Sequence, residues 1–408
     1  MSRAAFACLW GFVFVLPWED VIRLPLLGSI PRLVAVVALV VGGLFIVARG
    51  RVRPPAAFQL LALAFVLWAG LSGLWSIDAD ATRERFLTYL QLVVLVWLLW
   101  EIAWSPERQR ALLQAYVLGA CIAALAILQN YRAGISLAEA ARFTGLNANP
   151  NDLGLTLVLG LPMAWYLGLS APSRRFAWVW HLYLPLAVTA TLLTASRGAF
   201  VAALAALLII PWTWGQLRLR AQVAVCAFGL ASVVVAVGAV PDASLARLAT
   251  TRSDIESGHF GGRGVIWESG LQVVRAHPIV GVGAGAFGAA VEPTLRDRWS
   301  SHETFLAILA EEGIVGLALF LAMVGAALTR LRPLSVLERR FSIVLLVALA
   351  AASLTGQWDY HKQLWFVLGL VAAQGALRVA ATTGAHTGRR SVTQSRPPAP
   401  AVAMGRPW

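Results

Sequence analysis

Charged residues are scarce in this chain of 408 residues: they make up 13% of it, whereas hydrophobic residues make up 59%. The mean hydropathy is +0.73. A soluble protein of this length would have to expose large apolar patches at such a composition. The shortage of charge therefore excludes an ordinary soluble fold and indicates an integral membrane protein.

Cysteine is also scarce, and the three present are Cys8, Cys121 and Cys226. All three fall inside apolar segments, where cysteine behaves as a small core residue. This placement argues against a disulfide framework.

The chain lacks two further features, an internal repeat and a continuous basic domain. Transporters commonly show repeated halves, so the missing repeat argues against a transporter. The net charge of +13 comes from basic residues scattered over short loops. Such loops fit membrane orientation and contacts with membrane lipids better than nucleic-acid binding. We expect no nucleic-acid partner.

Apolar segments, in contrast, are abundant, and most approach the ~20 residues that a helix needs to cross a bilayer. An isolated segment in lipid satisfies its own backbone only as a helix. No small-x-small cleavage motif follows the first segment, so we keep it as a span. The sequence predicts an all-α polytopic fold with about twelve transmembrane helices, near residues 4–18, 31–48, 56–74, 88–104, 111–129, 153–170, 177–194, 198–214, 221–240, 302–328, 341–357 and 363–380.

Arginines accumulate in every second connection between these segments, which is the pattern of cytoplasmic loops. Both termini are therefore predicted to be cytoplasmic. We expect one membrane domain over residues 1–380 and a disordered cytoplasmic tail over 381–408. The connections with the arginine excess contain Arg3, Arg49, Arg51, Arg53, Arg108, Arg110, Arg174, Arg175, Arg218, Arg220, Arg330, Arg332, Arg339 and Arg340.

Two long connections, 130–152 and 241–301, fall on the external side. In the second, which precedes the tenth span, apolar residues alternate with polar ones from Ile266 to Arg275, as in a helix lying on a membrane surface. The glycine-rich run from Pro278 to Gly288 predicts a close-packed turn.

Polar residues at membrane level are costly and often functional. Three stand out on the external side: Arg197 between two spans, Arg263 among glycines, and His302 at the start of the tenth span. Each has a structural interpretation, because boundary arginines reach lipid headgroups, loop charges are solvated and interfacial histidines are common. Together they suggest chemistry: paired guanidinium groups bind phosphate oxygens, and an imidazole accepts a hydroxyl proton. Group transfer from a lipid diphosphate requires both.

The tenth span also carries spaced glycines. At ~100° per residue, Gly313 and Gly316 fall within ~40° of His302. Small residues on one face predict close approach of a neighbouring segment. Glu311 and Glu312, deeper in the span, are expected to face protein or a wet cavity.

His302-Glu303, nine further residues, then Gly313-Ile314-Val315-Gly316 resemble the ligase pattern of the O-antigen ligase and polymerase superfamily of bacterial envelope glycosyltransferases. Glu303 stands where the pattern has Asn, Ser or Gln. Residues 140–375 share the resemblance, including the segments 194–199, 262–267 and 278–288.

The resemblance implies a GT-C-like membrane enzyme in the inner membrane of a Gram-negative bacterium. It implies transfer of O-antigen polysaccharide from undecaprenyl diphosphate to a lipid A-core sugar hydroxyl at the periplasmic face. No nucleotide sugar, metal or other cofactor is implied. Arg197 and Arg263 would hold the diphosphate, His302 would activate the hydroxyl, and the sugar carbon would be inverted. Glu303, beside His302, would contact substrate.

Three further positions are candidates for substrate binding. Asn149 and Asn151 belong to the turn-rich run 147–152 entering the sixth span, where a helix N-terminus can receive a phosphate or sugar hydroxyl. An Asx-type helix cap is the structural alternative. Tyr360, in the last external loop, is a candidate for the rim of the same site.

Asp78 and Asp80 have the spacing with which some lipid-linked glycosyltransferases hold a divalent cation. A solvated turn explains them as well. The enzyme interpretation also leaves an O-antigen polymerase and a protein O-oligosaccharyltransferase open, and a transporter or non-catalytic scaffold remains beside it. The spacing from His302 to Gly313 favours the ligase.

Overall fold

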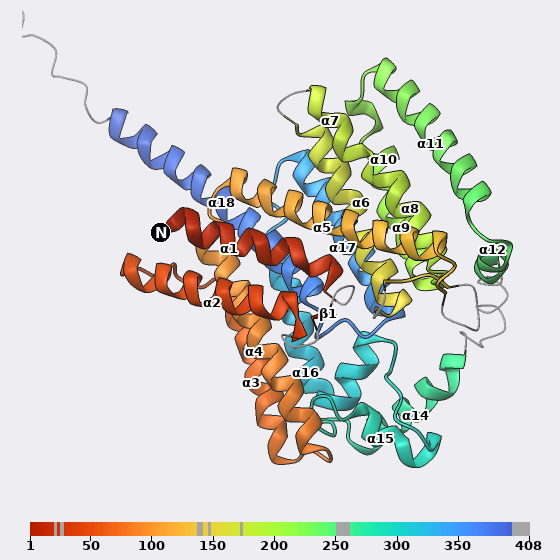
Figure 1. Cartoon of the computed structure of the whole chain (residues 1–408). Helices are drawn as coiled ribbons and strands as arrows, with labels where there is room; N and C mark the ends of the chain where they lie inside the picture. The colour runs from red at the N-terminus through yellow and green to blue at the C-terminus, as the bar shows by residue number, and fades with distance from the viewer. Residues whose placement is uncertain are drawn as a thin grey trace, which may run out of the picture.

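The computed structural model describes residues 1–19, 23–24, 28–136, 142–145, 148–171, 174–249 and 262–393. The described chain is almost entirely helical (Figure 1). Two two-residue strands, β1 (Arg23–Leu24) and β2 (Gly28–Ser29), pair antiparallel near its start. The helices are α1 (Ser2–Val15), η1 (Leu16–Trp18), α2 (Ile30–Arg49), α3 (Ala57–Leu71), η2 (Ser72–Leu74), α4 (Ala79–Ile102), α5 (Pro106–Arg132), α6 (Pro150–Leu169), α7 (Arg174–His181), α8 (Tyr183–Leu193), α9 (Arg197–Leu207), α10 (Ile209–Trp212), η3 (Trp214–Gln216), α11 (Leu219–Ala239), α12 (Asp242–Ala249), α14 (Arg263–Ala276), α15 (Phe287–Leu295), α16 (Thr304–Thr329), α17 (Val336–Thr355) and α18 (Lys362–Thr393).

Every predicted span coincides with one helix or with consecutive short helices. Within the described residues, six helices are long and apolar enough to cross a membrane, and they are α3 with η2, α4, α5, α6, α16 and the first part of α18. Five further apolar segments are shorter than 18 residues. The all-α class is confirmed, and the protein is a multi-pass membrane protein. The number of twelve crossings stays a prediction.

The helices form two groups, which are joined by the contacts of α18 with α5 and α17. In one group α3 and α4 pack on each other and on α16 and α18, and in the other α6 packs on α5, α8, α9 and α17. Among the six candidate membrane spans, α6 is the most enclosed, because 89% of its most apolar 18-residue stretch is buried inside the protein. Helix α11 lies along the right edge in Figure 1 with α12 at its end.

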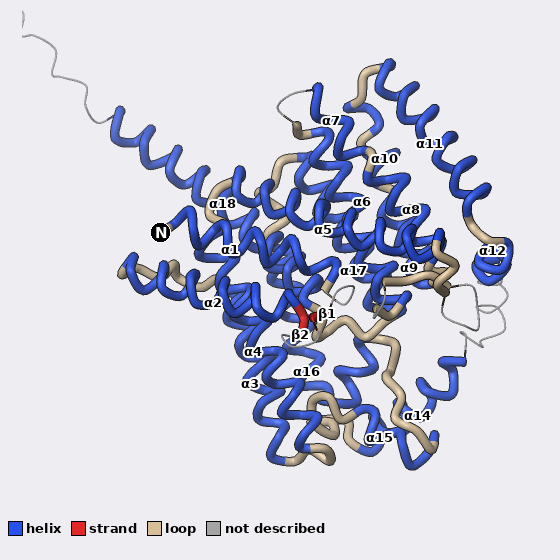
Figure 2. Tube along the Cα trace, in the orientation of Figure 1, coloured by secondary structure: helices blue, strands red, loops and turns tan. Residues whose placement is uncertain are grey.

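A helix, α14, is present within 241–301, where we expected one; it begins at Arg263 and ends at Ala276, and its place on a membrane surface stays a prediction. Its apolar face packs with α15 against the start of α16, in a small cluster separate from the main core. Figure 2 shows the long loops that join this corner to the bundle. The cluster is formed by Ile266, Phe287, Val291, Leu306 and Ala310. Residues 250–261 of this connection lie outside the described part.

Helix α16 is broken at Gly313, which has a φ of 68° and a ψ of −169°. The glycine-rich run after α14 enters this break. The Gly283 N–H donates to the Glu311 carbonyl at 2.8 Å, and the Ile314 N–H donates to the Pro278 carbonyl at 3.0 Å. A Cβ on Gly313 would lie 2.1 Å from the Ile279 carbonyl oxygen. The predicted close approach at Gly313 is therefore present.

The helical spacing used to relate His302 to the glycines is wrong, however. His302 precedes the first residue of α16 and has a φ of 50°, so it is not part of the helix. The break at Gly313 also interrupts the regular ~100° rotation from one side chain to the next. Gly313 serves the packing of the loop at 278–288, whereas a Cβ on Gly316 would lie 2.3 Å from the Glu312 Cβ and 3.4 Å from Trp68 Cδ1.

Glu311 and Glu312 are both buried, as expected for carboxylates at this depth. The Glu311 carboxylate accepts from the backbone N–H groups of Gly285 at 2.8 Å and Phe287 at 3.4 Å. It therefore fastens the glycine-rich loop to the broken helix.

The last helix differs from expectation in length. Helix α18 continues to Thr393, so its backbone is helical over the first part of the tail that we expected to be disordered. Residues 394–408 lie outside the described part, and the proposed disorder there stays a prediction. Cys8, Cys121 and Cys226 are all free thiols.

Candidate functional site

Arg197 is the first residue of α9, at the sharp turn between α8 and α9. Ala195 takes a φ of 49°, and the Ser196 hydroxyl caps the helix by accepting from the Ala199 N–H at 3.3 Å. Two glycines bring neighbouring helices to this turn. A Cβ on Gly198 would lie 2.6 Å from Thr355 Oγ1 at the end of α17, and one on Gly154 of α6 would lie 2.8 Å from the Ala199 Cβ.

Arg263 reaches the same place from α14. Gly262, with a φ of 87°, turns the chain into the helix, and Arg263 Nη1 donates to the Thr355 carbonyl at 2.7 Å. Burial lowers the pKa of the Arg263 guanidinium, the Asp152 carboxylate raises it, and the Arg197 guanidinium lowers it again. Two like charges thus act on each other beside Thr355.

His302 precedes α16 and lies near enough to Arg263 to feel its charge. Burial lowers the pKa of its imidazole, and the Arg263 guanidinium lowers it further. The Trp267 indole N–H donates to the Ser301 carbonyl at 2.9 Å, which ties the backbone before His302 to α14. The imidazole is therefore uncharged at neutral pH and able to accept a proton. We call Arg197, Arg263 and His302 the arginine–histidine site.

Glu303 has a structural role beside this site. Its side chain is the N-cap of α16 and accepts from the N–H groups of Phe305, at 3.1 Å, and Leu306. Burial raises the pKa of its carboxyl, and the two N–H groups lower it. Both oxygens are used in capping, so substrate contact by Glu303 stays a prediction.

Asn149 and Asn151 lie where α6 begins. Asn149 caps α6 and accepts from the Asn151 N–H at 2.9 Å, which is the Asx interpretation. The Asn151 side chain accepts from Arg142 Nη2 at 2.6 Å, and Arg142 Nε donates to the Thr194 carbonyl at 3.0 Å. Arg142 therefore links the start of α6 to the turn before Arg197. Asn147 lies outside the described residues.

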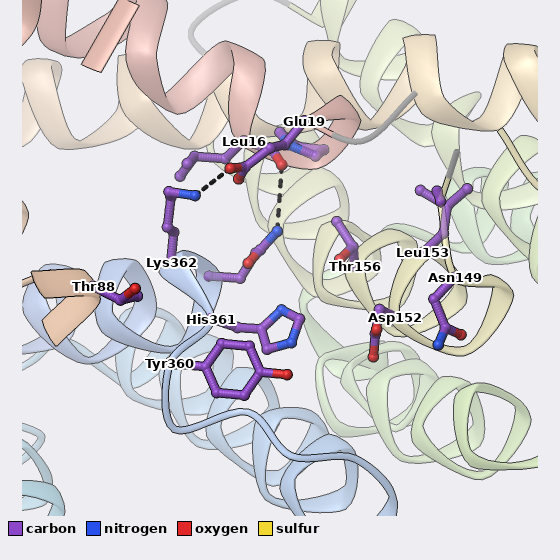
Figure 3. Close-up of a pocket in the computed structure, with 13 residues that line it drawn as sticks. Leu16, Glu19, Thr88, Asn149, Asp152, Leu153, Thr156, Tyr360, His361 and Lys362 are labelled. Atoms are coloured by element: carbon purple, nitrogen blue, oxygen red, sulfur yellow. Dashed lines mark hydrogen bonds and ion pairs between the residues drawn. The ribbon is translucent and has the colours of Figure 1, made fainter. Parts of the chain in front are cut away.

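Tyr360 is part of a cavity of about 200 Å³ between η1, α4, α6 and the start of α18. Figure 3 shows its hydroxyl pointing across this cavity toward Asp152, with Asn149 beside Asp152. Burial raises the pKa of the Tyr360 phenol to about 12. Tyr360, which we expected at the rim of the same site as the arginines, lies in the wall of this cavity.

Arg85 of α4 forms a separate polar cluster behind Tyr360. Its Nη1 lies 2.7 Å from Asp359 Oδ2 and 3.3 Å from Glu311 Oε2, and its guanidinium lies 4.2 Å from the centre of the Tyr360 ring. The Tyr89 hydroxyl donates to Asp359 Oδ2 at 2.6 Å. We call Arg85, Tyr89, Glu311 and Asp359 the Arg85 cluster.

Asp78 is a helix cap and an ion-pair partner. It accepts from the Ala81 N–H at 3.1 Å and pairs with Arg298 at 2.8 Å, while Asp80 lies in the first turn of α4. These contacts explain Asp78 without a metal. Within the described part of the chain, no group of three His, Cys, Asp or Glu residues is placed to hold a metal ion.

Reasoning from the sequence missed Arg142, Asp152 and Arg85. Arg142 and Arg85 belong to connections predicted to be external, where the positive-inside rule predicts few arginines. Their presence there could have identified them as candidate site residues. Asp152 was visible only as part of a helix-starting run. Its influence on both Arg263 and Tyr360 depends on the packing of three helices.

The arrangement offers two guanidinium groups at the N-terminal ends of α9 and α14, where backbone N–H groups add to the positive potential. An uncharged imidazole lies beside them. These groups can bind a diphosphate and take a proton from a nucleophile attacking next to it.

Comparison with known families agrees with this chemistry. The family model described as O-Antigen ligase matches residues 182–321, a segment that contains Arg197, Arg263 and His302. Comparison with curated proteins gives no match. The resemblance deduced from the motifs is confirmed at the level of the superfamily, whose members are glycosyltransferase-like enzymes.

Proposed function

We propose that this member of the O-antigen ligase superfamily is an O-antigen ligase. It transfers O-antigen polysaccharide from undecaprenyl diphosphate to a sugar hydroxyl of lipid A-core. The observation that carries the proposal is that Arg263 donates to Thr355 beside the turn that carries Arg197, whose charge lowers the pKa of Arg263, with His302 close enough for the Arg263 charge to lower its pKa.

The reaction forms one bond and breaks one bond. The acceptor oxygen attacks the sugar carbon that carries the diphosphate, and its proton passes to the imidazole of His302. The bond from that carbon to the diphosphate oxygen breaks, and the guanidinium groups of Arg197 and Arg263 stabilise the charge on the leaving diphosphate. Attack opposite the leaving group inverts the sugar carbon.

The proposed setting is the inner membrane of a Gram-negative bacterium, with both termini in the cytoplasm and the arginine–histidine site at the periplasmic face. Neither a metal nor a nucleotide sugar takes part. Full activity in EDTA is the expected result, and a loss restored by Mg²⁺ or Mn²⁺ would return attention to Asp78 and Asp80.

The test is complementation of a ligase-deficient strain, with lipopolysaccharide displayed on a gel. We expect wild-type protein to restore the O-antigen ladder and Arg197→Ala, Arg263→Ala and His302→Ala to fail at equal expression. His277→Gln, at the far end of α14, is the matched control and should restore the ladder.

A ladder from His302→Ala would contradict the assigned base. No ladder from well-expressed wild type, in strains offering several O-antigens, would contradict the ligase and direct the assay to repeat-unit polymerisation or protein glycosylation. Solute uptake into proteoliposomes would instead support a transporter.

A further inference from the structure

The cavity beside Tyr360 is not part of the arginine–histidine site, and its lining is mainly polar. Glu19 follows η1, Thr88 belongs to α4, Asn149 and Asp152 start α6, and Lys362 starts α18. Among the residues that the structure describes, the lining consists of Leu16, Pro17, Glu19, Thr88, Ala148, Asn149, Asp152, Leu153, Thr156, Tyr360, His361, Lys362 and Gln363.

The charges around the cavity nearly cancel. Lys362 Nζ pairs with Glu19, as the dashed line in Figure 3 shows, and Asp152, the other formal charge among the described lining residues, acts on the Arg263 guanidinium and raises its pKa. Burial lowers the pKa of His361 to about 3, so its imidazole is neutral. A lining whose formal charges each have an opposite charge nearby favours a neutral ligand with hydroxyl or amide groups over a phosphate.

Aromatic rings form one wall. The His361 ring lies 4.8 Å from the Tyr360 ring and is stacked on Trp358 at 5.0 Å between centroids. Trp358 is fully buried, and the Trp365 indole N–H donates to the Asp359 carbonyl in the same turn. The rings are thus held in place and offer a fixed apolar face opposite the polar groups of α6.

The size of the cavity limits the ligand. Its 200 Å³ falls below the ~300–1,000 Å³ of sites for drug-sized molecules. A single sugar ring is of suitable size, whereas an oligosaccharide is too large.

The cavity also adjoins the proposed diphosphate site. Asp152 lines the cavity, and its carboxylate raises the pKa of both Arg263 and Tyr360. A ligand in the cavity therefore lies one side chain away from the arginines.

We propose that this cavity binds one neutral sugar ring of a glycan substrate. Asn149 and Asp152 hydrogen-bond its hydroxyl groups, and Tyr360 and His361 pack against its apolar face. That the ring belongs to a substrate rests on the proposed function. Two substrates supply such a ring, since it is either the sugar joined to the lipid diphosphate or the terminal sugar of the acceptor.

Two variants test the cavity without touching the arginine–histidine site. Thr88→Phe fills it from α4, and Leu87→Phe is the matched control, because Leu87 is 46% exposed and does not line the cavity. Asn149→Ser keeps an N-cap for α6 but withdraws the side-chain amide. The Glu19–Lys362 ion pair is unchanged in all three.

The first experiment needs no assumption about the reaction. Saturation-transfer NMR is recorded on the full-length protein in nanodiscs with single hexoses, N-acetylhexosamines, 6-deoxyhexoses and heptoses. We expect at least one sugar to give a signal that Thr88→Phe abolishes, Asn149→Ser weakens about tenfold and Leu87→Phe leaves unchanged. No signal from any sugar with wild type, or equal signals with Thr88→Phe, would overturn the proposal.

The second experiment identifies the source of the ring by steady-state kinetics with purified lipid-linked polysaccharide and lipid A-core. If the ring is the donor's, Thr88→Phe raises KM for the donor at least tenfold and leaves KM for the acceptor unchanged. If it is the acceptor's, the pattern reverses. Unchanged values for both would contradict a substrate subsite. Sugar binding with no transfer by wild type would refute the proposed function and leave the cavity standing.

Discussion

The protein holds buried arginine in two contrasting ways. In the Arg85 cluster one guanidinium lies against two carboxylates, Asp359 at 2.7 Å and Glu311 at 3.3 Å. In the arginine–histidine site Arg263 donates to a backbone carbonyl, and a second arginine lies near enough to lower its pKa.

The two arrangements suggest different roles, one in stabilising the fold and one in binding a ligand. A buried charge surrounded by opposite charges contributes to folding, and removing one partner is costly. Two guanidinium groups brought together repel each other; the Asp152 carboxylate offsets this repulsion at Arg263, and a bound anion would offset it further. We read the first region as a fastening between α4, α16 and the turn before α18, and the second as an anion-binding site.

The largest expected effect comes from breaking the Arg85 cluster. Arg85→Ala would leave Asp359 and Glu311 without their cation and cost about 3–5 kcal/mol of stability. Thermal unfolding in detergent measures the loss. Arg83→Ala, at an exposed position two residues earlier, should leave the unfolding temperature unchanged. The double change Arg85→Met with Asp359→Asn should recover part of the loss, and no recovery would argue against charge balance as the cause.

Arg263→Ala should show the opposite behaviour, a large loss of activity with little change in stability. Loss of one donor to a developing negative charge lowers kcat about 100- to 1,000-fold. Arg263→Lys should retain part of the activity, because charge remains while the forked donor is lost. A drop in unfolding temperature as large as that of Arg85→Ala would mean that the two regions do not differ as described.

Gly313→Ala tests whether the break in α16 stabilises the fold, as we expect of the Arg85 cluster. The new Cβ would lie 2.1 Å from the Ile279 carbonyl oxygen, at a φ of 68°. Overpacking and backbone strain should each cost about 1–3 kcal/mol. Gly325→Ala, in the same helix with nothing within 4 Å of the new Cβ, is the matched control and should be neutral or slightly stabilising. Equal unfolding temperatures for the two variants would contradict the close packing.

The smallest effect is a pH dependence. The unprotonated form of His302 accepts the proton, and its pKa is lowered from the ordinary value of about 6.5. Activity should therefore be constant from neutral pH down to about 6.5 and fall only below it. His277→Gln should leave this kcat profile unchanged. A fall beginning above neutral pH would contradict an uncharged imidazole beside Arg263.

Much of the fold could be predicted because the bilayer imposes simple requirements. Each apolar segment of sufficient length satisfies its backbone as a helix, and every predicted span coincides with a helix or consecutive short helices. Arg197, Arg263 and His302 were identifiable because charged residues are rare next to apolar spans. Helix α14 was readable from the alternation after Arg263.

Other features had no local signature. Glu303 was expected at the substrate, but its position as N-cap depends on where α16 begins, two residues after His302. The break at Gly313 depends on the loop from Pro278 to Gly288 entering the helix, which no helical spacing within 302–316 reveals.

The sequence alone determined the membrane class, the helical segments and the residue types of the arginine–histidine site, because these follow from hydrophobicity and from the cost of charge near lipid. The tertiary structure alone decided that Arg263 reaches Thr355 beside the turn of Arg197, that Arg142 links Asn151 to that turn, that Asp152 acts on Arg263, and that α6 and the turn before α18 help to enclose a cavity. Those contacts join residues far apart in the sequence. Near Arg197 they depend on helices that pack so closely that only glycine fits between them.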